Sequence, residues 1–381
     1  MWKKSILFVS PVYVPYKWWW WVTQVALDYA KWLAWKWYNV TVATTLFDWL
    51  KKEESIDWIK ILRFWSYSKL LLKLWLYNPK WLCKFLKKNI KKYDILFIHD
   101  IYTLYGFIAW KICRKNNKPY FIMPHWMWCI SKQKDKIFVK KIFVKLFSSF
   151  ASKNATKVIF CSENEKKDYE IPYTSWIVIT NWIDQIKWTE DLNNINENDI
   201  DNFRKRYNLL GKKIIFSMWR LVNVKRFDKT ILYLKDFLRK NNDYMLLLIW
   251  PDWWEMENLG NIIEKEWLSG SVKIIPWLFW KDKTIIFKIS KLFILSSDLE
   301  WFPIVICEAI TSKIPCLLSE WCNVKWSKWF VEVFKNEEDF CEKLELLINK
   351  KNTINDDYYK LFDINNTIEK LDNIISSNII S

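Results

Sequence analysis

The sequence predicts an α/β protein made of two doubly wound domains, each built on a parallel sheet. Three observations support this fold class. Short apolar, β-rich runs alternate with helical stretches, which is typical of parallel strands joined by crossover helices. The alternation restarts after a polar stretch rich in Asn and Asp at residues 189–202. The 381 residues also suffice to build two hydrophobic cores.

The expected strands fall into two sets, one for each domain. The first set comprises residues 6–9, 40–43, 95–99, 120–123 and 157–161, with helices such as 23–34 between the strands. The second set comprises residues 213–218, 245–249, 272–275, 292–295 and 315–318. We expect an N-terminal domain at 1–184, a C-terminal domain at 185–357, and a helix within 358–381 that packs back on the N-terminal domain. Ligands of such sheets bind beyond the carboxyl ends of the strands, and a cleft between the domains is the expected site.

The amino-acid composition is unusual, with 30 Trp and only 4 Gly. A chain of this length carries about 27 glycines at average usage. Several tryptophans stand where the backbone favours glycine, such as the run Trp18–Trp21 between an expected strand and helix. We therefore hypothesise that most printed tryptophans are glycine in the native protein. A UGA codon printed as Trp but decoded as Gly, in an AT-rich genome, accounts for this. The alternative is a protein that is truly rich in tryptophan.

The positive charge is confined to the first half of the chain. Residues 1–185 hold 31 Lys and Arg against 13 Asp and Glu, whereas residues 186–381 hold 28 against 29. Residues 69–92 and 132–145 are both basic and apolar, and a helix over 136–150 would place its apolar side chains on one face. Each segment is either an ordinary surface helix or a helix lying on an anionic membrane. The uneven charge favours the membrane interpretation.

Cysteine and histidine usage gives no sign of a metal site. The eight cysteines lack paired short spacings, and the chain has only two histidines. We expect reduced thiols in a cytoplasmic protein, with no metal and no cofactor. No apolar run reaches the roughly 18 residues that a membrane-spanning helix needs.

Five short motifs follow one another in an order that resembles a known family. They are Pro11 with Trp18–Trp21, Pro124-His125-Trp126, Thr180-Asn181-Trp182-Ile183-Asp184, Ser217-Met218-Trp219-Arg220-Leu221 with Lys225, and the stretch from Glu300-Trp301-Phe302-Pro303 to Glu308-Ala309. With glycine in place of tryptophan, they resemble the motifs of family 4 retaining glycosyltransferases, including the E-x7-E element. Thr180 departs from the proline that the family has there. The resemblance covers nearly the whole chain and implies the GT-B fold, in which two Rossmann-like domains face a central cleft.

The resemblance also implies roles for individual residues. The expected catalytic residues are Glu300, His125, Arg220 and Lys225. Arg220 and Lys225 would stabilise the departing diphosphate, since fixed cations can carry its growing charge without a metal. The resemblance further assigns donor binding to Arg220, Lys225, Glu308, Trp301, Phe302, Pro303, Trp219 and Asn181. Glu308 would accept hydrogen bonds from the ribose. The loop Trp18–Trp21 would present backbone N–H groups to a phosphate of the donor or the acceptor.

Tryptophan at positions 18–21, 219 and 301 conflicts with these roles, because the indole rings would fill the donor site. The glycine reading predicts an active enzyme instead. We expect a retaining, metal-independent hexosyltransferase that moves sugar from a nucleotide-sugar to a lipid-linked or cell-surface glycan at the inner face of the membrane. Nucleic acid is not an expected partner. Two alternatives stay open: a GT-B sugar-nucleotide epimerase or phosphorylase, and a non-enzymatic basic protein that binds membranes or nucleic acid.

Overall fold

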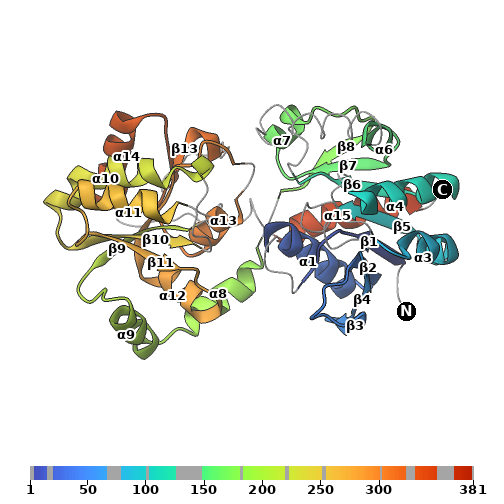
Figure 1. Cartoon of the computed structure of the whole chain (residues 1–381), viewed down its shortest axis with the longest axis horizontal. Helices are drawn as coiled ribbons and strands as arrows, with labels where there is room; N and C mark the ends of the chain where they lie inside the picture. Colours follow the sequence, from blue (N-terminus) through green and yellow to red (C-terminus); the bar gives the residue numbers. More distant parts are fainter. Residues whose placement is uncertain are drawn as a thin grey trace. The chain divides into compact units, whose positions relative to one another are not determined.

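The computed structural model divides the chain into two compact units (Figure 1). The N-terminal unit comprises residues 1–180 together with 367–381, and the C-terminal unit comprises residues 181–366. The structure describes residues 4–14, 20–66, 79–99, 103–125, 148–180, 183–218, 223–250, 255–300, 303–322, 331–349 and 364–379. The division falls a few residues before the expected boundary at 184 and extends past the expected limit at 357.

An eight-stranded sheet forms the centre of the N-terminal unit. Its strands are β1 (Ser5–Val9), β2 (Asn39–Thr45), β3 (Glu53–Ile56), β4 (Ile59–Phe64), β5 (Ile95–His99), β6 (Tyr120–Met123), β7 (Lys157–Phe160) and β8 (Trp176–Val178). Their order is β3-β4-β2-β1-β5-β6-β7-β8, and all neighbours are parallel except β3 and β4. The described helices are α1 (Trp20–Trp35), α3 (Leu82–Asn89), η1 (Ile90–Lys92), α4 (Leu104–Lys115), α6 (Ser149–Lys153) and α7 (Glu163–Asp168).

The last helix of the chain, α15 (Ile364–Ile379), returns to the N-terminal unit. The Tyr38 hydroxyl, which lies just before β2, donates a 2.5 Å hydrogen bond to Asp372 of this helix. Leu371 and Ile375 are completely or almost completely buried. Residues 358–363, which we expected to be helical, lie outside the described residues.

The C-terminal unit has a six-stranded sheet in the order β11-β10-β9-β12-β13-β14, and every pair is parallel. Its strands are β9 (Lys213–Met218), β10 (Tyr244–Trp250), β11 (Val272–Pro276), β12 (Ser290–Leu295), β13 (Cys316–Ser319) and β14 (Val331–Phe334). The helices are α8 (Gln185–Asn193), α9 (Glu197–Arg206), η4 (Asn223–Lys225), α10 (Phe227–Lys240), α11 (Met256–Lys265), α12 (Trp280–Ile289), α13 (Ile304–Thr311), η5 (Glu320–Cys322) and α14 (Glu337–Asn349). The prediction of two α/β domains with parallel sheets is confirmed.

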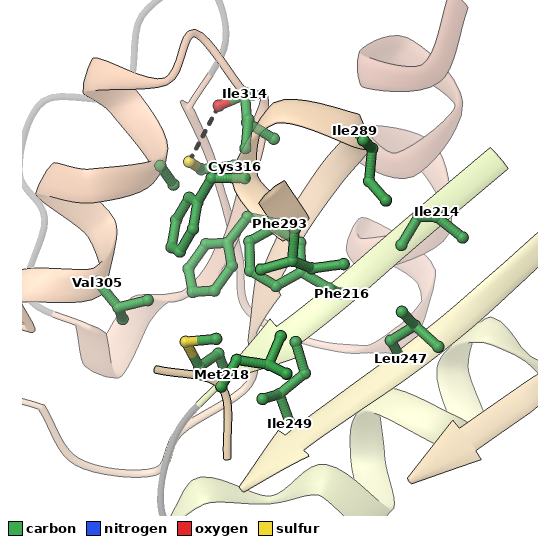
Figure 2. Packing of buried hydrophobic residues seen from close by; sticks show 14 of the residues in the cluster. Ile214, Phe216, Met218, Leu247, Ile249, Ile289, Phe293, Val305, Ile314 and Cys316 are labelled. Carbon is green, nitrogen blue, oxygen red and sulfur yellow. Dashed lines mark hydrogen bonds between the residues drawn. The ribbon is translucent and has the colours of Figure 1, made fainter. Parts of the chain in front are cut away.

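Aromatic packing beneath the β9–β12 pair fixes the centre of this sheet (Figure 2). Phe216 of β9 lies 5.1 Å from Phe293 of β12 and 5.0 Å from Phe287 of α12, measured between ring centroids. All three side chains are buried. Strands β9 and β12 are therefore held by a dense apolar core.

Among the described residues, four tryptophans adopt the left-handed backbone conformation that glycine favours. They are Trp37, Trp58, Trp81 and Trp267, with φ of 69°, 62°, 70° and 54°. All four side chains are exposed.

Candidate functional site

The carboxyl ends of β9 and β12 meet at the point where the strand order of the C-terminal sheet reverses. Strands β10 and β11 extend the sheet on one side of β9, and β12 to β14 extend it on the other. Such a switch point creates the crevice in which doubly wound sheets bind ligands. Lys225 of η4 follows β9, and Glu300 follows β12. The topology thus brings together two candidate residues that lie 75 positions apart.

Lys225 and Glu300 form a buried ion pair at this switch point. Lys225 Nζ donates to Glu300 Oε1 at 2.5 Å, and Ser297 Oγ donates to the same oxygen at 2.8 Å. The side chains are only 9% and 6% exposed. A buried ion pair adds little to stability in comparison with apolar packing, but removing one partner leaves the other charge unpaired. The pair therefore places a fixed cation and a fixed anion where a ligand would bind.

The electrostatic effect of this pair extends to Cys322 at the end of η5. Burial, and secondarily the negative charge of Glu300, raise the pKa of the Cys322 thiol to about 12. Ser319 Oγ lies 3.4 Å from Cys322 Sγ and donates to the carbonyl of Ser297 at 2.5 Å. Cys322 is therefore a neutral thiol that supports the loop holding Glu300.

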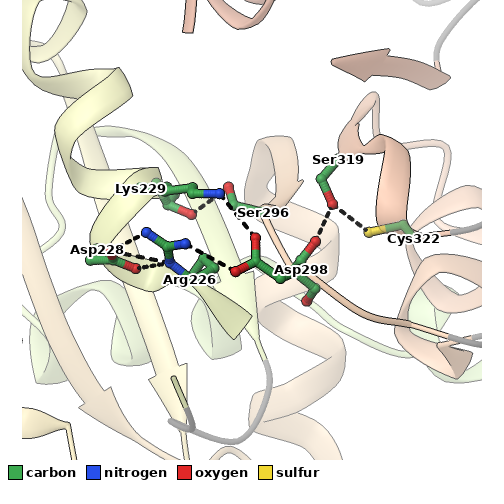
Figure 3. Close-up of polar contacts among 9 residues, drawn as sticks. Arg226, Asp228, Lys229, Ser296, Asp298, Ser319 and Cys322 are labelled. Atoms are coloured by element: carbon green, nitrogen blue, oxygen red, sulfur yellow. Dashed lines mark hydrogen bonds and ion pairs between the residues drawn. The ribbon is translucent and has the colours of Figure 1, made fainter. Parts of the chain in front are cut away.

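A charged network surrounds the turn that carries Lys225 (Figure 3). Arg226 donates from Nε and a terminal nitrogen to Asp228, and its other terminal nitrogen reaches Asp298 at 2.9 Å. Lys229 Nζ donates to the second oxygen of Asp298 at 2.9 Å. Lys229 and Arg226 hold the pKa of the Asp298 carboxyl below its usual value, against the opposing effect of its partial burial. Asp298 is therefore ionised at neutral pH and bound by two cations.

Glu308 lies one helix further along, in α13, and is paired with a lysine of α12. Lys283 Nζ donates to Glu308 Oε1 at 2.5 Å. Both side chains are mostly buried, and the ammonium group of Lys283 also lies 5.4 Å from the Trp188 ring. Pro303 is the N-cap residue of α13, so Glu300 precedes the helix that holds Glu308. The two carboxylates thus lie in a loop and in a helix, as their spacing predicted.

The two histidines of the chain form a pair in the N-terminal unit. His99 ends β5, and His125 follows the neighbouring strand β6. His99 Nδ1 and His125 Nε2 are 2.8 Å apart, and the rings stack with centroids at 5.1 Å. Burial lowers the pKa of His125 to about 3. Burial, followed by the charge of His125, also lowers the pKa of His99. Both rings are therefore neutral at pH 7.

The remaining predicted site residues are only partly described. Trp20 and Trp21 form the start of α1. The others lie outside the described residues: Trp18, Trp19, Trp126, Asn181, Trp182, Trp219, Arg220, Trp301 and Phe302. Sequence reasoning missed Lys283, Arg226 and Asp298, because their partners are distant in the chain or follow no motif. Among the described residues, no group of three or more His, Cys, Asp or Glu side chains is arranged to hold a metal ion.

Comparison with protein families identifies the class of enzyme. Residues 22–185 match the model of Glycosyltransferase Family 4, and residues 199–357 match that of Glycosyl transferases group 1. The chain is a glycosyltransferase of the GT-B type. None of the curated protein sequences matches this glycosyltransferase.

Solved structures share the fold of this glycosyltransferase at low sequence identity. Anabaena HepE in complex with UDP and glucose has a TM-score of 0.73 and 14% identity, covering 98% of this chain and 100% of HepE. A glycosyltransferase from Rickettsia africae has a TM-score of 0.73 and 16% identity, covering 100% and 99% of the two chains. WaaG, a glycosyltransferase involved in lipopolysaccharide biosynthesis, has a TM-score of 0.62 and 14% identity, covering 91% and 90%. These similarities bear on the fold, and the substrates named belong to those proteins.

Proposed function

We propose that the protein is a retaining glycosyltransferase that transfers a hexose from a nucleotide-sugar to a lipid-linked or cell-surface glycan. The observation that carries this proposal is the buried Lys225–Glu300 pair at the switch point of the C-terminal sheet. UDP-sugars are the first donors to test, since the HepE structure is a complex with UDP and glucose.

In this proposal, Lys225 stabilises the diphosphate as it leaves the sugar. Its ammonium group is already fixed by Glu300 and is nearly excluded from water, so its interaction with a phosphate would be stronger than in bulk solvent. Arg220 would add a second, forked cation. Two such cations can carry the charge that a metal ion carries in other transferases, which is why we propose a metal-independent reaction.

The carboxylates would bind the donor at its two ends. Glu308 would accept hydrogen bonds from the ribose, and Glu300 would lie beside the sugar hydroxyls. Both side chains are buried, so their contacts would form in a site of low dielectric. The start of α13 would add backbone N–H groups directed at phosphate, as helix N-termini do.

We assign acceptor binding and membrane contact to the N-terminal unit. His125 would contact the donor sugar, and its neutral ring can donate or accept one hydrogen bond. The described part of the basic segment 69–92 supports contact with a negatively charged surface. Five exposed lysines lie on α3 and η1, namely Lys84, Lys87, Lys88, Lys91 and Lys92. We propose that the protein acts in the cytoplasm at the inner face of the membrane.

The decisive experiment measures sugar release or transfer with a panel of UDP-, GDP- and ADP-sugars. The protein should carry glycine at positions 18–21, 126, 182, 219 and 301. We expect Glu300→Gln to lower the rate by about 100-fold or more, because the variant loses an interaction preorganised for the reacting sugar. The exposed Glu320→Gln is the matched control and should leave the rate unchanged. An unchanged rate in Glu300→Gln would refute the assignment of Glu300 as a catalytic residue.

The same preparation separates the alternative functions. An epimerase or a phosphorylase would convert the donor without a glycan acceptor, so a new sugar-nucleotide or sugar phosphate would be found in reactions with donor alone. A non-enzymatic membrane protein would bind liposomes and show no turnover with any donor.

Membrane contact predicts salt-sensitive binding to anionic vesicles. Replacing Lys84, Lys87 and Lys88 with Gln should lower the partitioning on phosphatidylserine vesicles by about 100-fold, at about 1 kcal/mol for each lysine. In the control variant, Lys235, Lys240 and Lys265 of the C-terminal unit are replaced with Gln. Equal loss of binding in both triple variants would contradict an N-terminal membrane surface, and vesicle flotation measures it.

A further inference from the structure

The loop that follows β12 is joined to the turn that follows β9 at three successive residues. The amide of Asp298 donates to the carbonyl of Val224 at 2.8 Å. Lys225 pairs with Glu300 at 2.5 Å, and Arg226 donates to Asp298 at 2.9 Å. The three contacts therefore fix the position of Lys225 relative to Glu300.

The backbone of Arg226 shows that this arrangement is enforced by its surroundings. Arg226 is the N-cap residue of α10 and has φ 50° and ψ 48°, a left-handed conformation that residues with a side chain seldom adopt. Its guanidinium group donates to two carboxylates, those of Asp228 and Asp298 (Figure 3). Charge-assisted bonds of this kind are among the strongest in proteins and can hold such a backbone.

We infer that Arg226 and Asp298 are positioning residues that set the place of the Lys225 ammonium group for the diphosphate of the donor. This inference rests on the proposed function. Neither residue needs to touch the nucleotide, because each acts through the Val224–Arg226 turn and the Asp298–Glu300 loop. Lys229, which also binds Asp298, secures the carboxylate from a second side.

The test uses the full-length glycine-containing protein and the variants Arg226→Gln and Asp298→Asn. The matched control is Arg239→Gln, since Arg239 lies in the last turn of the same helix and also bridges two acids, Asp236 and Glu266. Amide hydrogen exchange directly measures how firmly the Val224–Arg226 turn holds the Asp298–Glu300 loop. In both test variants we expect exchange at residues 297–300 to rise by about 10-fold or more, with no change in the control.

Nucleotide affinity then separates positioning from a structural role. The variants should bind UDP about 10-fold more weakly and bind uridine as the wild type does, because only UDP carries the phosphates. The double variant Arg226→Gln/Asp298→Asn should be no worse than either single variant. Equal weakening for UDP and uridine, or unchanged exchange at 297–300, would overturn the inference. If exchange rises but the wild type binds none of UDP, GDP and ADP, the proposed function fails and the positioning role fails with it.

A second inference concerns the four tryptophans with left-handed backbone, and it depends on none of the site residues. Two of them follow helices. After α11, Trp267 N–H donates to the carbonyl of Glu264 and Leu268 N–H donates to that of Ile263. After α1, Trp37 and Tyr38 make the same two bonds to Ala34 and Leu33. This pattern is the Schellman motif, whose left-handed position is usually glycine.

A third left-handed tryptophan lies in the turn of the β3–β4 hairpin. Ile56 pairs with Ile59, so Asp57 and Trp58 are the two turn residues, with φ of 50° and 62°. A two-residue turn with positive φ at both positions is of type I′, for which Asp-Gly is a preferred sequence. Trp58 and Trp267 are 75% and 89% exposed, so packing of their side chains does not explain tryptophan at these positions.

Trp188 differs from these tryptophans in backbone conformation and in packing. Trp188 lies within α8, its indole N–H donates to Ser312 Oγ at 2.8 Å, and its ring meets Phe287 edge to face at 5.2 Å. We propose that positions 37, 58, 81 and 267 are glycine in the native protein. This assignment extends the compositional hypothesis to named positions.

Peptide mass spectrometry on protein isolated from its natural source tests the assignment. The tryptic peptide 266–273 should have the mass expected for glycine at position 267, and the mass of a tryptophan there would overturn the proposal. Thermal unfolding provides an independent measurement on recombinant protein. Trp58→Gly and Trp267→Gly should each raise Tm by about 2–4 °C, because the strained backbone is relieved. The control Trp188→Gly should lower Tm. A lower Tm in all three variants would contradict the assignment.

Discussion

At the scale of single residues, the two histidines illustrate what burial does to a titratable pair. Each terminates or follows a parallel strand, and each is deprived of water, so the neutral ring is favoured. The sequence predicted His125 as a site residue and placed His99 at the end of an expected strand. It could not predict that they touch, because the contact depends on the register of β5 with β6.

The low histidine pKa values predict acid sensitivity of the N-terminal unit. The unfolded chain takes up protons below pH 6.5, while folded His125 does so only near pH 3. Stability therefore falls as the pH drops through this window, by up to about 1.4 kcal/mol per pH unit for each histidine. Thermal unfolding between pH 7.5 and 5.0 should show it. His125→Asn should flatten the dependence, and an unchanged slope would argue against the neutral pair.

At the scale of elements, the sequence predicted most strands and missed those whose turns or lengths are atypical. All ten expected strands are present with ends shifted by at most two residues. The hairpin β3–β4 was missed because its turn reads Asp57-Trp58, which hides the turn signal. β8 was missed because the periodicity of three residues is too brief to identify a strand. β14 was also missed, although it has four residues, as do the predicted strands β6, β7 and β13.

Helix α9 offers a prediction about local stability. Asn196 accepts from the amide of Asp199, and the Asp199 side chain accepts from the amide of Asn196, which makes a complete capping box. Asn196→Ala should lower the free energy of unfolding by about 1 kcal/mol, because the amide of Asp199 loses its partner. The control Asn202→Ala changes an exposed position of the same helix. Urea denaturation should show a difference between the two variants, and equal midpoints would contradict the cap.

At the scale of the whole molecule, the N-terminal unit is assembled from both ends of the chain. The sequence predicted a helix within 358–381 that packs back on the N-terminal domain, and α15 belongs to the N-terminal unit. The sequence could not predict which residues make the contact. The contact of Tyr38 with Asp372, 334 residues apart, is a property of the folded chain. The ion pair between Arg226 and Asp298 could not be predicted from the sequence either, because the two residues lie 72 positions apart in the chain.

This assembly predicts that a substitution in α15 weakens the first strands of the chain. Ile375→Ala should lower the stability of the N-terminal unit by about 2–5 kcal/mol, the cost of removing a buried isoleucine side chain. Hydrogen exchange at β1 and β2 would measure it, with the exposed Glu369→Ala as the control. Slow exchange at these strands in Ile375→Ala would show that α15 does not support them.

The return of α15 also sets the order in which the protein can mature on the ribosome. The C-terminal unit is contiguous, from Asn181 to Asn366, and can fold as soon as it emerges. The N-terminal unit is made first but lacks its last helix until the ribosome has read through the whole insertion, roughly 10–40 s later at ordinary synthesis rates. During that interval the surface that receives Leu371 and Ile375 is uncovered, and a chaperone has time to bind there.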